Sequence, residues 1–131
     1  MPTDKVMPIP LALLICDGAH RDPATGKWTL LGLFNSIRAN EFPVTHGQLV
    51  VYLAMTDVKG KLKLTFRLVD LDEDAEALFQ FDAEMRVDDP RTVAEVVIPV
   101  HGARFPSAGE FRLQVFVDGQ FLVERRMMVI R

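Results

Sequence analysis

Apolar and polar residues alternate along most of the chain, in short stretches separated by Gly, Pro, Asp and Asn. In the clearest stretch, apolar and polar positions alternate strictly: Leu62, Leu64, Phe66 and Leu68 against Lys61, Lys63, Thr65 and Arg67. A period of two residues is typical of a β-strand with one buried face, because successive side chains of a strand point to opposite sides. No helical period competes with it, and the pattern predicts an all-β protein.

Eight stretches of this kind are expected to form strands. They cover about residues 9–19, 27–39, 48–57, 61–71, 77–87, 92–100, 111–117 and 121–130. Turn signals at residues 22–26 and at Asp118-Gly119 indicate two-stranded hairpins. Pro99 lies inside the sixth stretch and indicates an edge strand or a bulge, since proline has no amide hydrogen to donate to a neighbouring strand. Loops are expected at residues 40–47, 72–76 and 101–109.

Regularly spaced antiparallel strands predict a β-sandwich. Eight strands cannot all bury one face in a single open sheet, so two sheets packed face to face, in an immunoglobulin-like arrangement, are the economical solution. A closed β-barrel is the alternative, because the number of strands does not separate the two. The chain of 131 residues is expected to form one domain over residues 8–131, preceded by a flexible N-terminal arm at residues 1–7.

Composition and charge indicate the class of protein and the cellular compartment. The chain has 49% hydrophobic and 25% charged residues and a formal net charge of −3, which is typical of a globular protein and gives no electrostatic footprint for nucleic acid. The single cysteine, Cys16, cannot form an intrachain disulfide, so a reducing, cytoplasmic compartment is expected. The apolar run at residues 8–16 is too short to cross a membrane and contains Pro8 and Pro10, and it is interpreted as the first strand.

The first three strands are apolar on both faces. In the third, one face consists of Leu49, Val51, Leu53 and Met55 and the other of Val50, Tyr52 and Ala54. A second apolar face needs a cover, which neighbouring side chains, the N-terminal arm, a protein partner or a second copy of the chain can supply. Val50, Tyr52 and Ala54 are therefore candidate interface residues, and a homodimer is a possible assembly.

One end of the sandwich is a candidate ligand site. If each strand crosses the sandwich once, the loops at 40–47, 72–76 and 101–109 lie at the same end. They bring together groups that can recognise a small ligand or a carbohydrate: Phe42, His46, His101, Arg104 and Phe105. Histidines in loops and phenylalanines in turns also commonly cap a hydrophobic core, which is the alternative reading of these five residues.

The sequence gives little support for a metal site or a catalytic site. Asp17 and Asp22, with the acidic run from Asp70 to Asp74, suggest a calcium-binding sandwich of the C2 type. The two acidic turns are separated by three strands and are expected at opposite ends, which argues against a shared ion. Two distant histidines lack the ligand spacing of zinc sites, and no serine lies in a nucleophile elbow. We therefore assign no catalytic residue, metal or cofactor and expect a protein that is not an enzyme.

Two segments of the chain resemble a known family. The first comprises Leu14–Asp17, Thr25–Phe34 and Phe42-Pro43, and the second comprises Phe105-Pro106, Gly109–Val115 and Asp118-Gly119. The first segment is similar to the opening of a family of small uncharacterised bacterial proteins, and the second is similar to the closing hairpin of that family. The resemblance implies a stand-alone bacterial β-sandwich domain of unknown function, with no established catalytic or binding residues.

Taken together, these observations favour a non-enzymatic β-sandwich module that binds another protein or itself through the sheet of its first three strands. Recognition of a small ligand or carbohydrate at the loop end is the second hypothesis.

Overall fold

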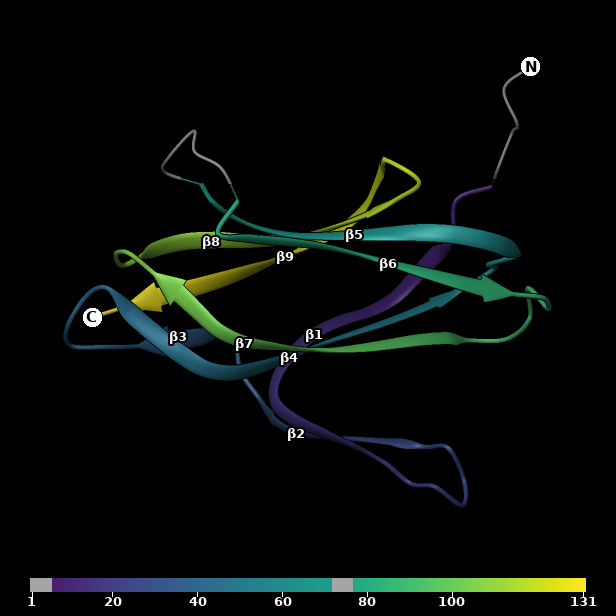
Figure 1. Cartoon of the computed structure of the whole chain (residues 1–131), viewed down its shortest axis with the longest axis horizontal. Coiled ribbons are helices and arrows are strands. Elements are labelled where there is room, and N and C mark those ends of the chain that lie inside the picture. Colours follow the sequence, from purple (N-terminus) through teal and green to yellow (C-terminus); the bar gives the residue numbers. More distant parts are fainter. Residues whose placement is uncertain (1–5, 72–76) are drawn as a thin grey trace.

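The computed structural model describes residues 6–71 and 77–131, in which the chain forms nine strands and no helix (Figure 1). The strands are β1 (Ile9–Arg21), β2 (Trp28–Leu33), β3 (Ser36–Arg38), β4 (Val44–Thr56), β5 (Gly60–Asp70), β6 (Phe79–Val87), β7 (Ala94–Phe105), β8 (Gly109–Val117) and β9 (Gln120–Ile130). No helix that could span a membrane occurs in this described part of the chain. Most of the predicted N-terminal arm, residues 1–5, and the predicted loop at residues 72–76 lie outside the described residues.

The strands form two sheets packed face to face. The four-stranded sheet has the order β2-β1-β4-β7 and the five-stranded sheet the order β3-β9-β8-β5-β6. Every pair is antiparallel except β3 with β9, which is parallel. Figure 1 shows β5, β6, β8 and β9 in one layer above β1, β4 and β7 in the other. The prediction of an all-β, two-sheet sandwich is confirmed, and the sheets do not close into a barrel.

The core lies between the two layers and follows the period of two residues that the sequence shows. On β5, Leu62, Leu64, Phe66 and Leu68 are at most 2% exposed, whereas the lysines between them face solvent. Phe66 stacks on Phe81 of β6 with ring centroids 5.0 Å apart. The opposite layer supplies inward-facing residues of β4, among them the fully buried Leu53.

The second predicted strand is in fact two strands, so the prediction of eight was one too few. Between β2 and β3 the chain passes from the four-stranded to the five-stranded sheet. The amide of Phe34 donates to the carbonyl of Ile15 in β1, and the carbonyl of the next residue, Asn35, accepts from the amide of Met128 in β9. Two consecutive residues thus bond to different sheets, and the alternating pattern alone does not show this change of partner.

Two of the predicted loops are shorter than expected, because β4 and β7 extend into them. Val44 pairs with Phe105 and His46 with Ala103, so residues 44–47 and 101–105 are strand rather than loop. Glycines at 47 and 102 face each other in this pairing, and Gly102 has a φ of 70°. The alternation of faces is broken there. The prediction that Pro99 marks an edge strand is confirmed, because β7 is the outermost strand of its sheet.

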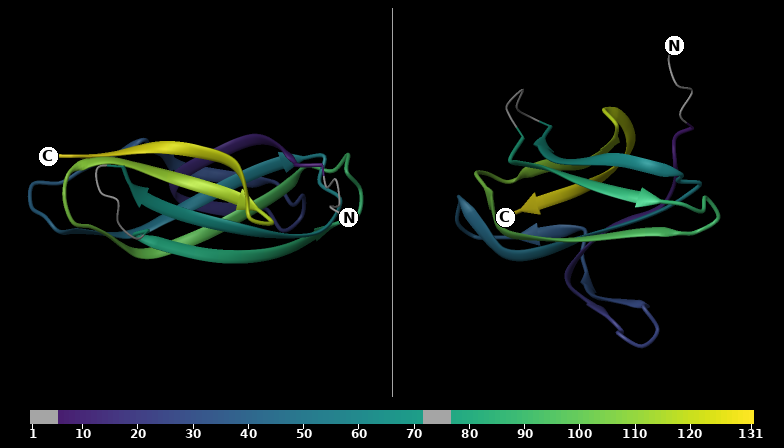
Figure 2. Two further views of the ribbon diagram at one scale, coloured as in Figure 1. Left: turned by 90° about the horizontal axis from the view of Figure 1, so that it is seen from above. Right: turned by 45° about the vertical axis from the view of Figure 1, so that its right-hand side comes forward.

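The second half of β1 leaves the sandwich together with β2. The first half of β1 pairs with β4, but from Gly18 to Arg21 it pairs only with β2. Figures 1 and 2 show this hairpin, residues 17–33 and below called the β1–β2 hairpin, projecting on the outer side of the four-stranded sheet. It bends where Asp17 faces Gly32. Gly32 has a φ of 69°, and a Cβ atom there would lie 2.4 Å from Asp17 Oδ2, so glycine is required.

Candidate functional site

The outer faces of the two sheets differ in chemistry, and this difference defines the candidate site. On the five-stranded sheet, cross-strand ion pairs cover the surface. Lys61 Nζ lies 3.4 Å from Glu84 Oε2, and Lys63 Nζ lies 3.5 Å from Asp82 Oδ2. The lysines of this strand are thus paired with carboxylates of β6, which is the usual arrangement on a solvated sheet face.

A second charged network lies on β8 and β9 of the same sheet. Arg112 donates to Glu110 Oε2 at 2.8 Å and also to Glu124, and Arg126 Nε lies 3.2 Å from Glu110. The hydrogen bond from Arg112, together with the nearby charge of Arg126, lowers the pKa of Glu110 below its ordinary value. The hydrogen bonds that Arg112 donates to Glu110 and Glu124 raise the pKa of Arg112 in turn. Most of this face therefore presents matched charges, and its exposed apolar side chain among the described residues is Phe121, which contacts Phe116 next to the β8–β9 turn and is 53% exposed.

The outer face of the four-stranded sheet is apolar. Leu14 of β1 pairs with Tyr52 of β4, and Cys16 pairs with Val50. Since Leu53 and its neighbours Val51 and Met55 face the core, Val50, Tyr52 and Ala54 point outward. The doubly apolar third strand inferred from the sequence therefore lies in the structure with one face in the core and the other toward the outside.

Neighbouring parts of the chain already cover much of that strand. Val50 is 3% exposed and Ala54 is 5% exposed, so of the three predicted interface residues only Tyr52 offers appreciable side-chain surface. The Tyr52 hydroxyl donates to Glu95 Oε2 at 2.5 Å. Partial burial and the Glu95 carboxylate raise the pKa of Tyr52 to about 12.

Cys16 is fully buried on this face, and its Sγ lies 3.2 Å from the carbonyl oxygen of Gly18. Burial raises the pKa of the thiol above its ordinary value, which keeps it protonated at neutral pH. Cys16 therefore acts as a small apolar side chain in this structure.

The exposed apolar surface of the four-stranded sheet lies on β1 and β2 instead. Leu31 and Leu33 of β2 are 56% and 59% exposed, and Ile9 and Leu11 of β1 are 50% and 53% exposed. These four residues make up half of the large hydrophobic side chains that are exposed in the described residues. A pattern of alternation could not single them out, because it does not show that the hairpin leaves the sandwich.

The five residues predicted to bind a ligand lie at one end of the sandwich, where Phe105 belongs to the core and Phe42 packs against it. Phe105 is fully buried, with its ring centroid 5.2 Å from that of Phe111. Phe42 is half-buried under the guanidinium of Arg131, and His46 lies with its ring centroid 5.5 Å from that of Phe34.

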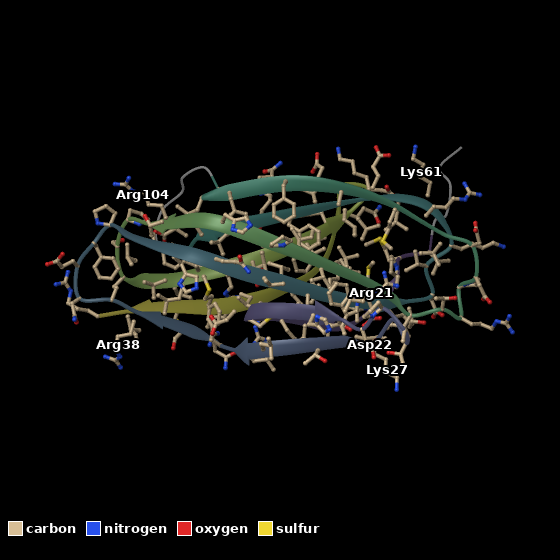
Figure 3. All side chains as sticks on the ribbon, turned by 60° about the horizontal axis from the view of Figure 1, so that its bottom comes forward. Arg21, Asp22, Lys27, Arg38, Lys61 and Arg104 are labelled. Carbon is tan, nitrogen blue, oxygen red and sulfur yellow. The ribbon has the colours of Figure 1, made fainter. Side chains whose placement is uncertain are left out.

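The other two, His101 and Arg104, are exposed on β7. Figure 3 shows Arg104 at the opposite end of the molecule from Arg21 and Lys61. The structure thus gathers the five predicted residues in one region but divides them between core and surface.

A cavity of about 350 Å³ lies at the other end of the sandwich. Its walls come from three segments that are distant in sequence: residues 6–8, the β4–β5 turn and the β8–β9 turn. The lining residues are Val6, Met7, Pro8, Val58, Lys59, Leu62, Val117, Asp118 and Gln120. Sequence reasoning missed this cavity because no local pattern brings these segments together.

The acidic turns give no metal site among the described residues, where no group of three potential ligands occurs. Asp22 Oδ1 accepts a hydrogen bond of 2.9 Å from the amide of Ala24, which stabilises the hairpin turn and lowers the pKa of Asp22. Asp72, Glu73 and Asp74 lie outside the described residues.

The two packed sheets define an all-β sandwich domain. Residues 11–130 match the model of a family of unknown function, DUF6941, and the chain belongs to this family. The resemblance to an uncharacterised family of β-sandwich proteins is thereby confirmed. No curated protein sequence matches the chain.

Two solved structures are similar to the chain at low sequence identity. An immunoglobulin-like protein from Pseudomonas aeruginosa is 15% identical, with a TM-score of 0.43 and coverage of 97% of this chain and 99% of that one. The alkylpurine DNA glycosylase AlkC from Pseudomonas fluorescens, bound to DNA containing an abasic site analogue, is 9% identical, with a TM-score of 0.47. The similarity covers 91% of this chain, which spans 30% of the length of the glycosylase.

Proposed function

We propose that the protein is a non-enzymatic binding module that contacts other protein through the β1–β2 hairpin and the adjoining outer face of the four-stranded sheet. The contrast between the two outer faces carries this proposal. One face is covered by paired charges such as Lys63 with Asp82, whereas the other presents Tyr52 and the exposed leucines of β2. A contiguous apolar surface on one side of a soluble domain is typical of a protein interface.

The energetic argument rests on Leu31 and Leu33. Each leaves more than half of its surface in water. Completing the burial of a half-exposed leucine stabilises a complex by about 1 kcal/mol, since full burial contributes about 1.5–3 kcal/mol. Tyr52 lies on the same side of the sheet, and tyrosine is enriched at interfaces because a large apolar ring carries a polar tip.

The buried, protonated Cys16 is compatible with action in a reducing compartment such as the cytoplasm, which is part of the proposal.

Site-specific photo-crosslinking in the native host tests the proposed surface. A photoreactive amino acid is placed at position 31, in the β1–β2 hairpin, and in a matched control at position 80, an exposed residue of β6 on the charged sheet. Covalent protein adducts are expected from position 31 and not from position 80. Equal yields from both positions, or adducts from position 80 alone, would contradict the proposed surface.

A second candidate function is the binding of a small amphipathic anion in the cavity at the β4–β5 and β8–β9 turns. The cavity has apolar walls from Val58 and Val117 and two charged residues at its lining, Lys59 and Asp118. Asp118 Oδ1 already accepts a hydrogen bond from the amide of Lys63, and Lys59 supplies the cation. A thermal shift with medium-chain carboxylates that is lost in Lys59→Gln supports this candidate. An unchanged melting temperature across the series argues against it.

A further inference from the structure

Of the four strands at the ends of the two sheets, β2, β7, β3 and β6, only β2 lacks a feature that blocks pairing with another chain. An edge strand exposes backbone donors and acceptors that can pair with another strand, and proteins block such edges with proline, charge or short length. The edge strand β7 contains Pro99, and β3 has three residues. The edge strand β6 presents charged residues, among them Asp82 and Glu84. β2, with the sequence WTLLGL, contains no proline and no charged residue.

The alternation of hydrogen-bonded and non-hydrogen-bonded pairs in the hairpin shows which backbone N–H and C=O groups of β2 point away from β1. The amide of Asp22 donates to the carbonyl of Lys27 at the end of the hairpin, and Arg21 pairs with Trp28. Hydrogen-bonded and non-hydrogen-bonded pairs alternate in an antiparallel ladder. Thr29 and Leu31 therefore direct their backbone groups toward β1, whereas Trp28 and Leu30 direct theirs to the outer edge.

We infer that this edge binds β2 of a second copy of the chain, in antiparallel orientation, with a two-fold axis through Thr29. In this register Trp28 pairs with Leu30 of the second copy and Leu30 with Trp28, and each pair exchanges two backbone hydrogen bonds. The edge is thus self-complementary. The inference deepens the proposed function, on which it rests, by naming the partner of the β1–β2 hairpin.

The side chains match in the same register. Trp28 and Leu30 lie on one face of the hairpin, so each tryptophan ring meets a leucine of the other copy across the new pair. On the other face Thr29 lies directly opposite its own counterpart. Lys27 and Leu31 lie opposite each other, where the methylenes of the lysine can cover part of the leucine.

The projection of the hairpin makes this pairing sterically accessible. Figures 1 and 2 show that β2 extends away from the body of the sandwich, so a second hairpin can approach its edge. The short pairing predicts a modest affinity, because an interface of this size is smaller than that of a typical stable dimer.

Charge variants at the two-fold axis test the inference. Thr29 is exposed in the single chain, so Thr29→Lys and Thr29→Glu are compatible with its fold, but each variant places two like charges opposite each other in the dimer. Sedimentation equilibrium is expected to show a concentration-dependent dimer for the original chain and at least tenfold weaker self-association for each variant. An equimolar mixture of the two variants is expected to restore association. Thr92→Lys, at an exposed position between β6 and β7, is the matched control and is expected to behave as the original chain.

A disulfide trap captures the complex even if it is weak. In a non-hydrogen-bonded antiparallel pair the Cα atoms lie about 4.5 Å apart, within reach of a disulfide. Thr29→Cys is expected to give a disulfide-linked dimer under mild oxidation. Thr92→Cys and the original chain, whose Cys16 is buried, are expected to give no disulfide-linked dimer.

The outcomes separate this inference from the function on which it rests. An original chain that stays monomeric at its highest soluble concentration, with no trapped dimer of Thr29→Cys, overturns the homodimer. Self-association of Thr29→Lys and Thr29→Glu at the original strength also overturns it. If crosslinks from position 31 to other proteins persist in either case, the proposed binding surface stands and only the identity of its partner is wrong.

Discussion

Replacement of Gly32 by alanine tests how the β1–β2 hairpin is directed away from the sandwich. Gly32 has a φ of 69°, and a Cβ atom would lie 2.4 Å from Asp17 Oδ2 and 3.1 Å from Asp17 Cβ. A left-handed backbone costs a residue with a Cβ atom about 1–2 kcal/mol. Displacement of the Asp17 side chain from its preferred rotamer adds about 0.5–1.5 kcal/mol. Gly32→Ala is therefore expected to destabilise the hairpin by about 1.5–3.5 kcal/mol.

The cost is expected to fall on the hairpin rather than on the whole domain, because from Gly18 to Arg21 β1 pairs only with β2. A free-energy change of this size accelerates hydrogen exchange through local opening by about 10- to 400-fold. Hydrogen–deuterium exchange is the assay. Faster exchange is expected for the amides of residues 18–22 and 28–33, with little change for the central residues of β4.

Two matched variants separate the cost of the left-handed backbone from the cost of the contact with Asp17. Gly119 has a φ of 82° and no atom within 4 Å of a Cβ position, so Gly119→Ala carries only the backbone cost. The double variant Asp17→Ala/Gly32→Ala relieves the contact with the carboxylate and is expected to recover only that part of the loss. If Gly32→Ala exchanges as slowly as the original chain over residues 18–33, the assignment of the bend to this contact is refuted.

Two further substitutions test the core and the apolar sheet face. Phe105→Ala is expected to lower the free energy of unfolding by about 3–5 kcal/mol, because it leaves a cavity at a fully buried position. His101 is exposed, so the control His101→Ala is expected to change this free energy by less than about 0.5 kcal/mol. Denaturant unfolding measures both. Tyr52 is the only tyrosine of the chain, so an ultraviolet titration reports on it alone. It is expected to ionise near pH 12 in the folded chain and near pH 10 after unfolding. Glu95→Gln is expected to lower the folded-state pKa only in part, because partial burial, the larger cause of the shift, remains. Since the folded-state pKa is the higher one, this group's contribution to stability is present below pH 10 and lost between pH 10 and about 12.

The sequence predicted a strand correctly where the evidence was the alternation of neighbouring apolar and polar residues. Alternation from Lys61 to Leu68 placed β5 correctly, because the side-chain direction of each residue depends only on its place along the strand. It could not predict that the chain changes sheets at Phe34 and Asn35, since that change depends on which carbonyl and amide groups, far along the chain, are within reach.

The loops at the predicted ligand end show a different limit. The glycine and proline residues around 43–47 and 101–109 favoured a loop, but Gly47 and Gly102 lie opposite each other in paired strands. Glycine marks an unusual backbone conformation, which a loop and an irregular strand pair both use. Phe105 thereby reaches the core, although its position in a supposed loop made it a candidate for ligand contact.

For the candidate interface, the sequence found the correct strand but the wrong exposed residues. Val50 and Ala54 do face away from the core, as the alternation indicated, yet they are almost fully buried by the rest of the chain. Burial on an outer face depends on neighbouring strands and on the direction in which the β1–β2 hairpin leaves the sheet, and neither is encoded in the alternation of β4.

Two independent observations, side-chain exposure and backbone hydrogen bonding, point to the same strand, β2. Exposure alone marks Leu31 and Leu33 as apolar side chains that gain by burial. The hydrogen-bonding pattern, which does not depend on side-chain hydrophobicity, points the backbone groups of Trp28 and Leu30 to the unprotected edge of the same strand. A hairpin that only completed the fold of a monomer would gain from a blocking charge or proline at this edge, as β6 and β7 have. The absence of both from β2, while the other three end strands of the two sheets are protected, is the feature that a binding role explains and a purely structural role does not.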